Sequence, residues 1–154
     1  MVAKYISRSL EDTARLARAI AGHLHRGDVL ALDGDLGAGK TTFTKFLGSA
    51  LGIEEEISSP TFNILKCYFK GKMPLYHIDA YRLEEGINRD IGLEEVIEGD
   101  GIAVIEWADF IEDLLFQPLK MRIERADETT RIVTLSSDWE KYAPVFEEIE
   151  AIGR

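Results

Sequence analysis

The sequence is poor in cysteine and proline and has no long hydrophobic run. One cysteine among 154 residues excludes an internal disulfide. That residue, Cys67, lies in a strand-like segment, where we expect a small buried hydrophobic side chain. No apolar stretch approaches the roughly 18 residues of a membrane-spanning helix, and no basic-then-apolar leader opens the chain. We therefore expect a cytoplasmic protein that makes no contact with the membrane.

Positive charge is also scarce. The chain has 18 Lys and Arg against 28 Asp and Glu, a net charge of −10. Tight, autonomous binding to a nucleic-acid backbone requires a broad basic surface, so this class of function is improbable, although a local basic patch or docking on a basic partner stays open. The three histidines and one cysteine give no zinc-binding spacing. His23 and His25 are expected to be structural residues that end the first helix.

What the sequence does contain is a complete phosphate-binding P-loop at 34–41, Gly-Asp-Leu-Gly-Ala-Gly-Lys-Thr. A short apolar strand at 28–32 precedes it, and a helix with apolar residues at helical spacing follows it. The glycines allow backbone N–H groups to surround phosphate oxygens. Lys40 is expected to reach the β- and γ-phosphates, and the Thr41 hydroxyl to bind Mg²⁺. The sequence therefore predicts a nucleoside triphosphate site.

Two acidic residues are candidates for hydrolysis, which also needs a metal-positioning acid and a group that orients water. Glu106 ends an apolar run, the position of a Walker-B acid at the carboxyl edge of a sheet. We expect it to hold Mg²⁺ or to polarise water; the alternative is an ordinary first exposed residue after a core strand. Asp79 lies in the cluster His-Ile-Asp-Ala-Tyr-Arg at 77–82. It is a candidate for orienting or deprotonating water.

Four other residues near these acids have open interpretations. His77 shares a strand face with Asp79 and is expected to be a structural, hydrogen-bonded residue. Arg82 either meets a phosphate or pairs with Asp79. Thr61 either senses the γ-phosphate in a switch segment or belongs to a plain turn. Trp107 is either a packing residue or a platform on which the base stacks.

The hydrophobic pattern predicts an α/β fold, P-loop NTPase-like, as a single domain over residues 1–154. We expect a mixed central sheet with antiparallel hairpins and flanking helices. The expected helices are 9–27, capped by Ser9 and closed by Gly27, 41–51, and one or two short ones within 83–98. The expected strands are 28–32, 62–69, 75–78, 101–105, 119–125 and 131–135. Residues 54–56 are expected to form a solvated loop. The segment after Trp139 carries no signal that we can assign.

Four motifs in this order resemble the TsaE (formerly YjeE) family of bacterial ATPases. They are the P-loop at 34–42, Ser-Pro-Thr-Phe at 59–62, the cluster at 77–82, and Ile-Glu-Trp at 105–107. The resemblance implies an ATP-binding and ATP-hydrolysing subunit, weak alone, needed for threonylcarbamoyladenosine modification of tRNA beside the anticodon. It implies that the chain acts with two actin-like-fold proteins of the threonylcarbamoyl transferase complex and contacts tRNA only indirectly or weakly.

The same resemblance assigns roles to individual residues, with ATP and Mg²⁺ as cofactors. Thr41 and Glu106 would hold Mg²⁺, and Asp79, Glu106 and Lys40 would be catalytic. Thr61 would bind the nucleotide from a switch segment. Tyr81, Arg82 and Trp107 would line the site or its partner-facing rim. The phosphate cradle would comprise Asp35, Leu36, Gly37, Ala38, Gly39, Lys40, Thr41 and Thr42. Trp107 is followed by Ala108, where many relatives have proline, which alters a loop entry rather than the chemistry.

Two functions of other classes remain. A small-molecule kinase shares the P-loop and the short length, but its usual Arg-rich lid is missing, because Arg122 and Arg125 lie in an expected hairpin. A binding-only switch that never hydrolyses is disfavoured by the two acids Asp79 and Glu106. The ATPase subunit is the preferred interpretation, and the lack of an obvious second arginine finger near the P-loop predicts slow hydrolysis without partners.

Overall fold

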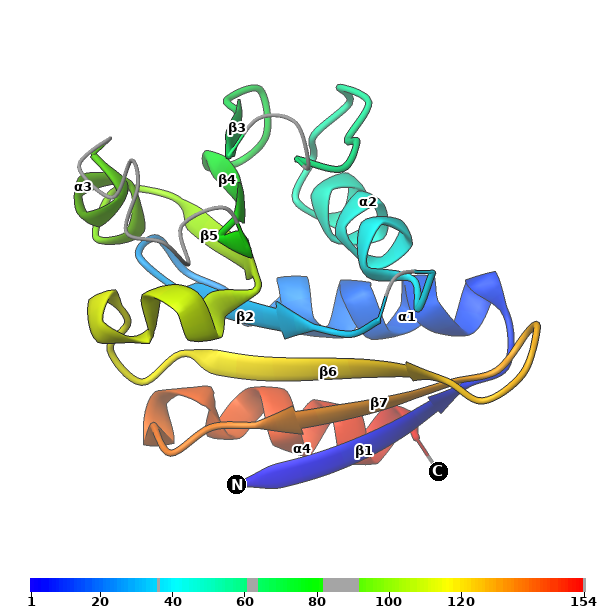
Figure 1. Ribbon diagram of the computed structural model, residues 1–154. Coiled ribbons are helices and arrows are strands. Elements are labelled where there is room, and N and C mark those ends of the chain that lie inside the picture. Colours follow the sequence, from blue (N-terminus) through cyan, green and yellow to red (C-terminus); the bar gives the residue numbers. More distant parts are fainter. Residues whose placement is uncertain (36, 61–63, 82–91, 154) are drawn as a thin grey trace.

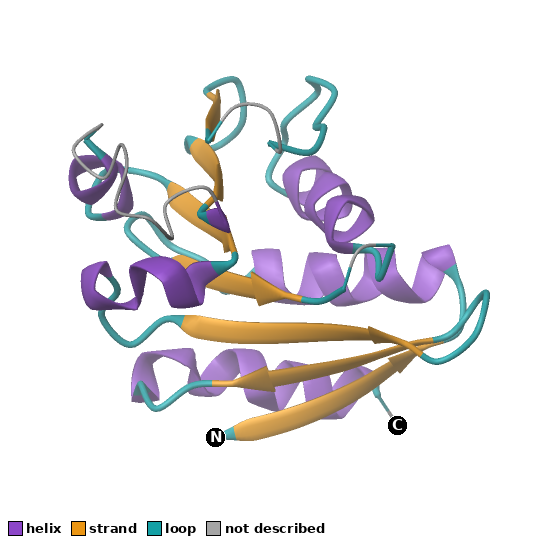
Figure 2. Ribbon diagram, in the orientation of Figure 1, coloured by secondary structure: helices purple, strands orange, loops and turns teal. Residues whose placement is uncertain are grey.

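A mixed seven-stranded sheet forms the centre of the protein, with helices on both faces (Figures 1 and 2). The structure is a computed structural model, and it describes residues 1–35, 37–60, 64–81 and 92–153. The strand order is β1-β7-β6-β2-β5-β4-β3. Strands β4, β5, β2 and β6 are parallel, and β3, β7 and β1 pair antiparallel with their neighbours. This arrangement confirms the predicted α/β fold class.

The elements have the following bounds. The strands are β1 (Val2–Ser7), β2 (Val29–Asp33), β3 (Leu65–Tyr68), β4 (Leu75–Asp79), β5 (Ile102–Glu106), β6 (Leu119–Arg125) and β7 (Arg131–Ser136). The helices are α1 (Leu10–Ala21), α2 (Lys40–Ala50), α3 (Leu93–Ile97) and α4 (Ala143–Ile152), with 3₁₀ helices η2 (Ala108–Leu114) and η3 (Glu140–Tyr142). No helix among these described residues is long and apolar enough to cross a bilayer.

Alternation along the central strands divides the core between the two faces of the sheet. In β5, Ile102 and Val104 pack into the larger core with α1, α2 and α4. The intervening Ala103 and Ile105 pack into the smaller core with α3 and η2. Because successive strand side chains point to opposite faces, Glu106 continues the face of Val104. The last residue of β5 therefore faces α2, the helix that follows the P-loop.

The local sequence signals for the first helix and the two hairpins are confirmed. The Ser9 Oγ accepts a hydrogen bond of 3.1 Å from the Asp12 N–H at the start of α1, as expected of an N-cap serine. Strands β3 and β4 pair antiparallel, as do β6 and β7. The region 54–56 carries no helix or strand. Of the helices expected within 83–98, α3 is present, and 83–91 lie outside the described residues.

Three predictions are wrong. Helix α1 ends at Ala21 with Gly22 as its C-cap, because the next N–H groups no longer bond four residues back: the His23 N–H donates to the Ile20 carbonyl. His23 and His25 therefore follow the helix instead of ending it. Cys67 is exposed, not buried. It lies on β3, the last strand of the sheet, and faces away from the side on which its neighbour Tyr68 is buried.

Strand β1 and helix α4 had no counterpart in the sequence analysis, and neither had the 3₁₀ helices η2 and η3. Strand β1 buries Ala3, Tyr5 and Ser7 while Val2 and Ile6 are exposed, so its alternation is hard to recognise from hydrophobicity. Helix α4 packs on α1 and β1. Its signal was available, since proline stands in its first turn and the buried Val145, Phe146 and Ile149 lie at helical spacing.

Candidate functional site

The P-loop connects the carboxyl end of β2 to the first turn of α2, as the sequence predicted. A Cβ on Gly34 would lie 2.7 Å from the carbonyl oxygen of Ile123, so the strand β6 backbone leaves room only for glycine. Gly39, which precedes α2, has a φ of +110°, a conformation that L side chains rarely adopt. The Phe43 N–H then donates to the Gly39 carbonyl at 2.9 Å and starts the helix. The backbone geometry thus requires glycine at both positions.

The predicted cradle residues that the structure describes lie at this turn. Asp35 and Gly37 are exposed, and Ala38 is buried. Gly39, Lys40, Thr41 and Thr42 are half-buried at the beginning of α2. Leu36 lies outside the described residues, as do Thr61 and Arg82, so the proposed switch segment and the proposed phosphate contact of Arg82 are not described.

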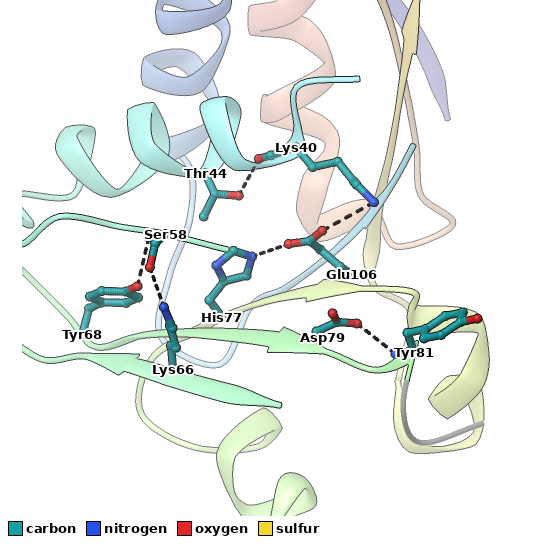
Figure 3. A network of polar contacts seen from close by, with 9 residues as sticks. All are labelled: Lys40, Thr44, Ser58, Lys66, Tyr68, His77, Asp79, Tyr81 and Glu106. Atoms are coloured by element: carbon teal, nitrogen blue, oxygen red, sulfur yellow. Dashed lines mark hydrogen bonds and ion pairs between the residues drawn. The ribbon is translucent and has the colours of Figure 1, made fainter. Parts of the chain in front are cut away.

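Lys40, Glu106 and His77 form one chain of polar contacts beside the P-loop (Figure 3). The Lys40 Nζ lies 3.5 Å from the Glu106 Oε1, and the Glu106 Oε2 lies 2.7 Å from the His77 Nε2. The Lys40 and Glu106 side chains are only 11% and 8% exposed, and His77 is fully buried. A P-loop lysine and a strand-end acid therefore meet in a nearly dry site.

The protonation states of Glu106 and His77 follow from the geometry of these contacts. Burial raises the pKa of Glu106, but the hydrogen bond and charge of His77, together with Lys40, outweigh it and hold the pKa below the ordinary glutamate value. Glu106 is therefore a carboxylate at neutral pH. A carboxylate only accepts hydrogen bonds, so the His77 Nε2 carries the proton and donates. The His77 Nδ1 is buried and has no hydrogen-bond partner within the described part of the chain.

Asp79 lies beside Glu106 at the carboxyl edge of the sheet. The two residues are register partners of the parallel strands β4 and β5. Figure 3 shows Asp79 and His77 on the same side of β4, the shared face that the sequence predicted. The Asp79 Oδ1 accepts a hydrogen bond of 3.0 Å from the Tyr81 N–H, and the side chain is nearly buried. Asp79 is thus held at the edge that carries Glu106.

Trp107 follows Glu106 in a left-handed backbone conformation, with a φ of +58°. Its ring lies 5.2 Å from the Lys40 Nζ and stacks on Phe110 at a centroid distance of 6.1 Å. The Tyr81 ring meets it edge-on at 5.2 Å. Tyr81 and Trp107 are 53% and 41% exposed. Tyr81, Trp107 and Phe110 therefore form a partly exposed aromatic cluster next to the Lys40 ammonium group.

Sequence analysis missed one residue at the P-loop, Arg131. Its Nε donates to the Ala38 carbonyl at 2.8 Å. Its Nη1 donates to the carbonyls of Asp127 and Thr130 at 2.9 and 3.1 Å. One guanidinium therefore ties the β6–β7 turn to the P-loop. No motif marks this role, because arginine in a hairpin is usually an exposed strand residue; only the pairing of β6 with β2 places it here.

We expect Arg131→Ala to loosen the P-loop and the β6–β7 turn together. The loss of the guanidinium removes the donor to the part-buried Ala38 carbonyl, whereas water can replace it at the exposed Asp127 carbonyl. We therefore expect a cost of about 0.5–1.5 kcal/mol in unfolding free energy. Urea denaturation measures this cost, and hydrogen exchange is expected to speed up at 37–42 and 126–130. Arg131→Lys, which lacks the planar fork, is expected to be intermediate. Arg125→Ala is the control, because the exposed Arg125 also donates to the Asp127 carbonyl, at 3.3 Å, but makes no bond to the P-loop that the structure shows. Equal effects of the two alanine variants contradict the assignment.

We expect His77→Ala to destabilise the fold through Glu106. Without the imidazole, the buried Glu106 Oε2 loses its donor, which costs about 1–3 kcal/mol in addition to the cavity left behind. His77→Gln keeps an amide N–H donor and is expected to recover part of this loss. Urea denaturation measures the unfolding free energy, which is expected to be highest for the wild type, lower for His77→Gln and lowest for His77→Ala. Equal stability of the Gln and Ala variants would show that packing alone explains His77.

Comparisons with known proteins agree with this geometry. The family model described as "Threonylcarbamoyl adenosine biosynthesis protein TsaE" matches residues 7–133. A "tRNA threonylcarbamoyladenosine biosynthesis protein TsaE" of Bacillus subtilis (strain 168) is 44% identical over 140 residues, covering 90% of this chain and 88% of the relative. A protein of the same name from Treponema pallidum (strain Nichols) is 48% identical over 105 residues, covering 68% of this chain and 77% of the relative.

A solved structure extends the similarity to the whole fold. The crystal structure of YdiB from Bacillus subtilis superposes with a TM-score of 0.82 at 36% sequence identity. The superposition covers 100% of this chain and 97% of that one. The described architecture, including β1 and α4, is therefore shared with a known protein.

Proposed function

Because this chain belongs to the TsaE family, we propose that it binds and hydrolyses ATP with Mg²⁺ in support of threonylcarbamoyladenosine biosynthesis on tRNA. The relatives carry that pathway in their names. The observation that supports the ATPase activity best is the contact of 3.5 Å between Lys40 and Glu106. It joins a phosphate-binding lysine to an ionised acid at the end of a neighbouring parallel strand, the arrangement that P-loop hydrolases need.

The donor set suits Mg²⁺. This ion takes one or two protein oxygens and completes its shell with phosphates and water. The Thr41 hydroxyl and the Glu106 carboxylate are such oxygens, and Glu106 is held in place by His77. A group of three or more His, Cys, Asp or Glu side chains suited to a metal is absent from the described residues. When bound, Mg²⁺ would neutralise charge that develops on the transferred phosphoryl group.

The remaining residues have separable roles in this proposal. Lys40 would leave Glu106 for the β- and γ-phosphates, because the phosphate charge exceeds that of one carboxylate. Asp79, which lies beside Glu106, would orient the attacking water. The first turn of α2 would supply backbone N–H groups to the phosphates. Lys40 is the first residue of α2, and Asp79 and Glu106 are the last residues of β4 and β5. Because regular elements fix their positions, these groups favour a preformed site.

The proposed setting is the cytoplasm, with the two actin-like-fold proteins of the threonylcarbamoyl transferase complex as partners. The net charge of −10 favours docking on proteins over direct reading of tRNA. Hydrolysis by the isolated chain is expected to be slow, with the partners completing the site. Vigorous turnover by the chain alone would contradict this part of the proposal.

The decisive experiment is threonylcarbamoyl transfer to tRNA over many turnovers by the two partner proteins and their activated donor. The reaction is run without the chain, with it, and with Glu106→Gln, each with ATP and with a non-hydrolysable analogue. Continued turnover only with the intact chain and hydrolysable ATP supports the proposal. A rate that is indifferent to the chain refutes it.

A further inference from the structure

Strand β6 carries the β6–β7 turn past the end of β2 and along the P-loop. The pairing of β6 with β2 stops at Arg122, which lies opposite Asp33, the last residue of β2. Beyond this pair, β6 continues through residues 123–125, and the Ile123 carbonyl lies close to Gly34. Figure 1 accordingly shows the β6–β7 turn at the same end of the sheet as the P-loop. The turn at 126–130 is therefore within reach of the backbone that is expected to bind phosphates.

The β6–β7 turn itself fixes the orientation of the Arg131 guanidinium. The Asp127 Oδ1 accepts hydrogen bonds of 2.9 and 2.8 Å from the N–H groups of Thr129 and Thr130, which holds the backbone of the turn. The Arg131 Nη1 then donates to the carbonyls of Asp127 and Thr130, at 2.9 and 3.1 Å. Because the guanidinium is planar and rigid, these two bonds through one nitrogen also set the direction of the Nε–H group.

The Nε–H group of Arg131 determines the direction of one peptide group in the P-loop. It donates to the carbonyl of the buried Ala38 at 2.8 Å. In a trans peptide the C=O and the following N–H point in opposite directions. Since the Ala38 carbonyl is directed at Arg131, the Gly39 N–H points away from the β6–β7 turn. Within the part of the chain that the structure describes, this N–H makes no hydrogen bond, so it can donate to a phosphate oxygen.

Two features of Arg131 go beyond what the stability of the hairpin needs. The carbonyls of the turn already have the Nη1 as their donor, so the bond from the Nε to Ala38 is a separate contact, made across 93 positions. In addition, none of the ion pairs among the described residues includes Arg131. Its positive charge next to the P-loop is therefore not paired with a carboxylate and attracts an anion there.

We propose that Arg131 is a positioning residue for phosphate binding, which holds the Ala38 carbonyl so that the Gly39 N–H faces the phosphates. This inference rests on the proposed function, because it assumes that the P-loop binds a triphosphate. Arg131 acts through the peptide group before Lys40 and makes no contact with Glu106 on the opposite strand. Its loss therefore weakens the binding of phosphates and leaves the rate of the hydrolysis step at saturation nearly unchanged.

The first test measures dissociation constants of ATP and of inorganic triphosphate, both with Mg²⁺, under conditions in which every variant is folded by circular dichroism. We expect Arg131→Ala to weaken both ligands by the same factor, about tenfold. Arg131→Lys keeps the charge but loses the planar fork, and is expected to weaken both about threefold. Arg125→Ala removes the same charge from the same turn without a bond to the P-loop that the structure shows. It is the control and is expected to resemble the wild type, as is the single-turnover hydrolysis rate of Arg131→Lys at saturating ATP.

The second test observes the Gly39 N–H directly, and Arg131→Lys serves for it even where Arg131→Ala does not fold. Proteins labelled with ¹⁵N-glycine are saturated with inorganic triphosphate and Mg²⁺. We expect a large downfield shift of the Gly39 amide proton in the wild type and a smaller one in Arg131→Lys. An Arg131→Lys protein with the affinity and the Gly39 shift of the wild type overturns the inference, as does equal weakening by Arg131→Ala and Arg125→Ala. A wild type that binds neither ATP nor inorganic triphosphate would instead refute the proposed function itself.

Discussion

Lys40→Ala is expected to remove ATP binding almost completely while the protein remains folded. The Lys40 side chain is 11% exposed and lies at the lysine position of the P-loop. Loss of the lysine from a largely desolvated lysine–phosphate pair costs about 2–5 kcal/mol of binding free energy. The dissociation constant of ATP is then expected to rise roughly 30- to 5,000-fold. Titration of Mg-ATP by calorimetry measures this change. Glu106 keeps its hydrogen bond to His77, so the unfolding free energy is expected to fall much less than the binding free energy.

Lys45→Ala is the matched control for this experiment. Lys45 is exposed on the same helix and takes no part in the contacts beside Glu106. Its removal deletes the same charge from the chain, so any long-range effect of net charge appears in both variants. An Lys40→Ala protein that binds ATP within fivefold of Lys45→Ala would show that the P-loop does not bind phosphates in the expected way.

Glu106→Gln is expected to stop hydrolysis and to preserve binding. The substitution keeps the size of the side chain but removes the charge that would hold Mg²⁺ or polarise water. General acid–base groups typically contribute about 10²- to 10⁴-fold to a rate, so single-turnover hydrolysis is expected to slow by a factor in this range. The dissociation constant of ATP is expected to change only a few-fold, because the backbone and Lys40 still reach the phosphates. Quenched-flow measurement of single-turnover ADP formation tests the rate.

Glu112→Gln is the control for Glu106→Gln, since Glu112 is exposed on η2 close to the same edge of the sheet. It loses the same charge outside the site. Hydrolysis by Glu106→Gln at the rate of Glu112→Gln would exclude Glu106 from the chemistry and would favour Asp79 as the acid. Loss of ATP binding in Glu106→Gln alone would indicate that the metal contributes mainly to affinity.

The sequence predicted most of the parts of this fold because their signals are local. The P-loop, the Ser9 cap and the two hairpins each depend on a few adjacent residues and on simple periodicity. The wrong end of α1 has the same origin. Apolar spacing continues to Leu24, which is buried after the helix has ended. Periodicity reports which side chains are buried, and it does not report where the helical hydrogen bonds stop.

The sequence by itself determined the family, the phosphate-binding loop and the acids at two strand ends, since short motifs carry these features. Only the tertiary structure decided which distant groups meet. Strand register brings His77 to Glu106 across 29 positions, and the pairing of β6 with β2 brings Arg131 to Ala38 across 93. It also decided that the Trp107 ring lies beside the Lys40 ammonium group. The physical reason is that a contact between separated segments depends on register and packing of the whole sheet, which no local pattern encodes.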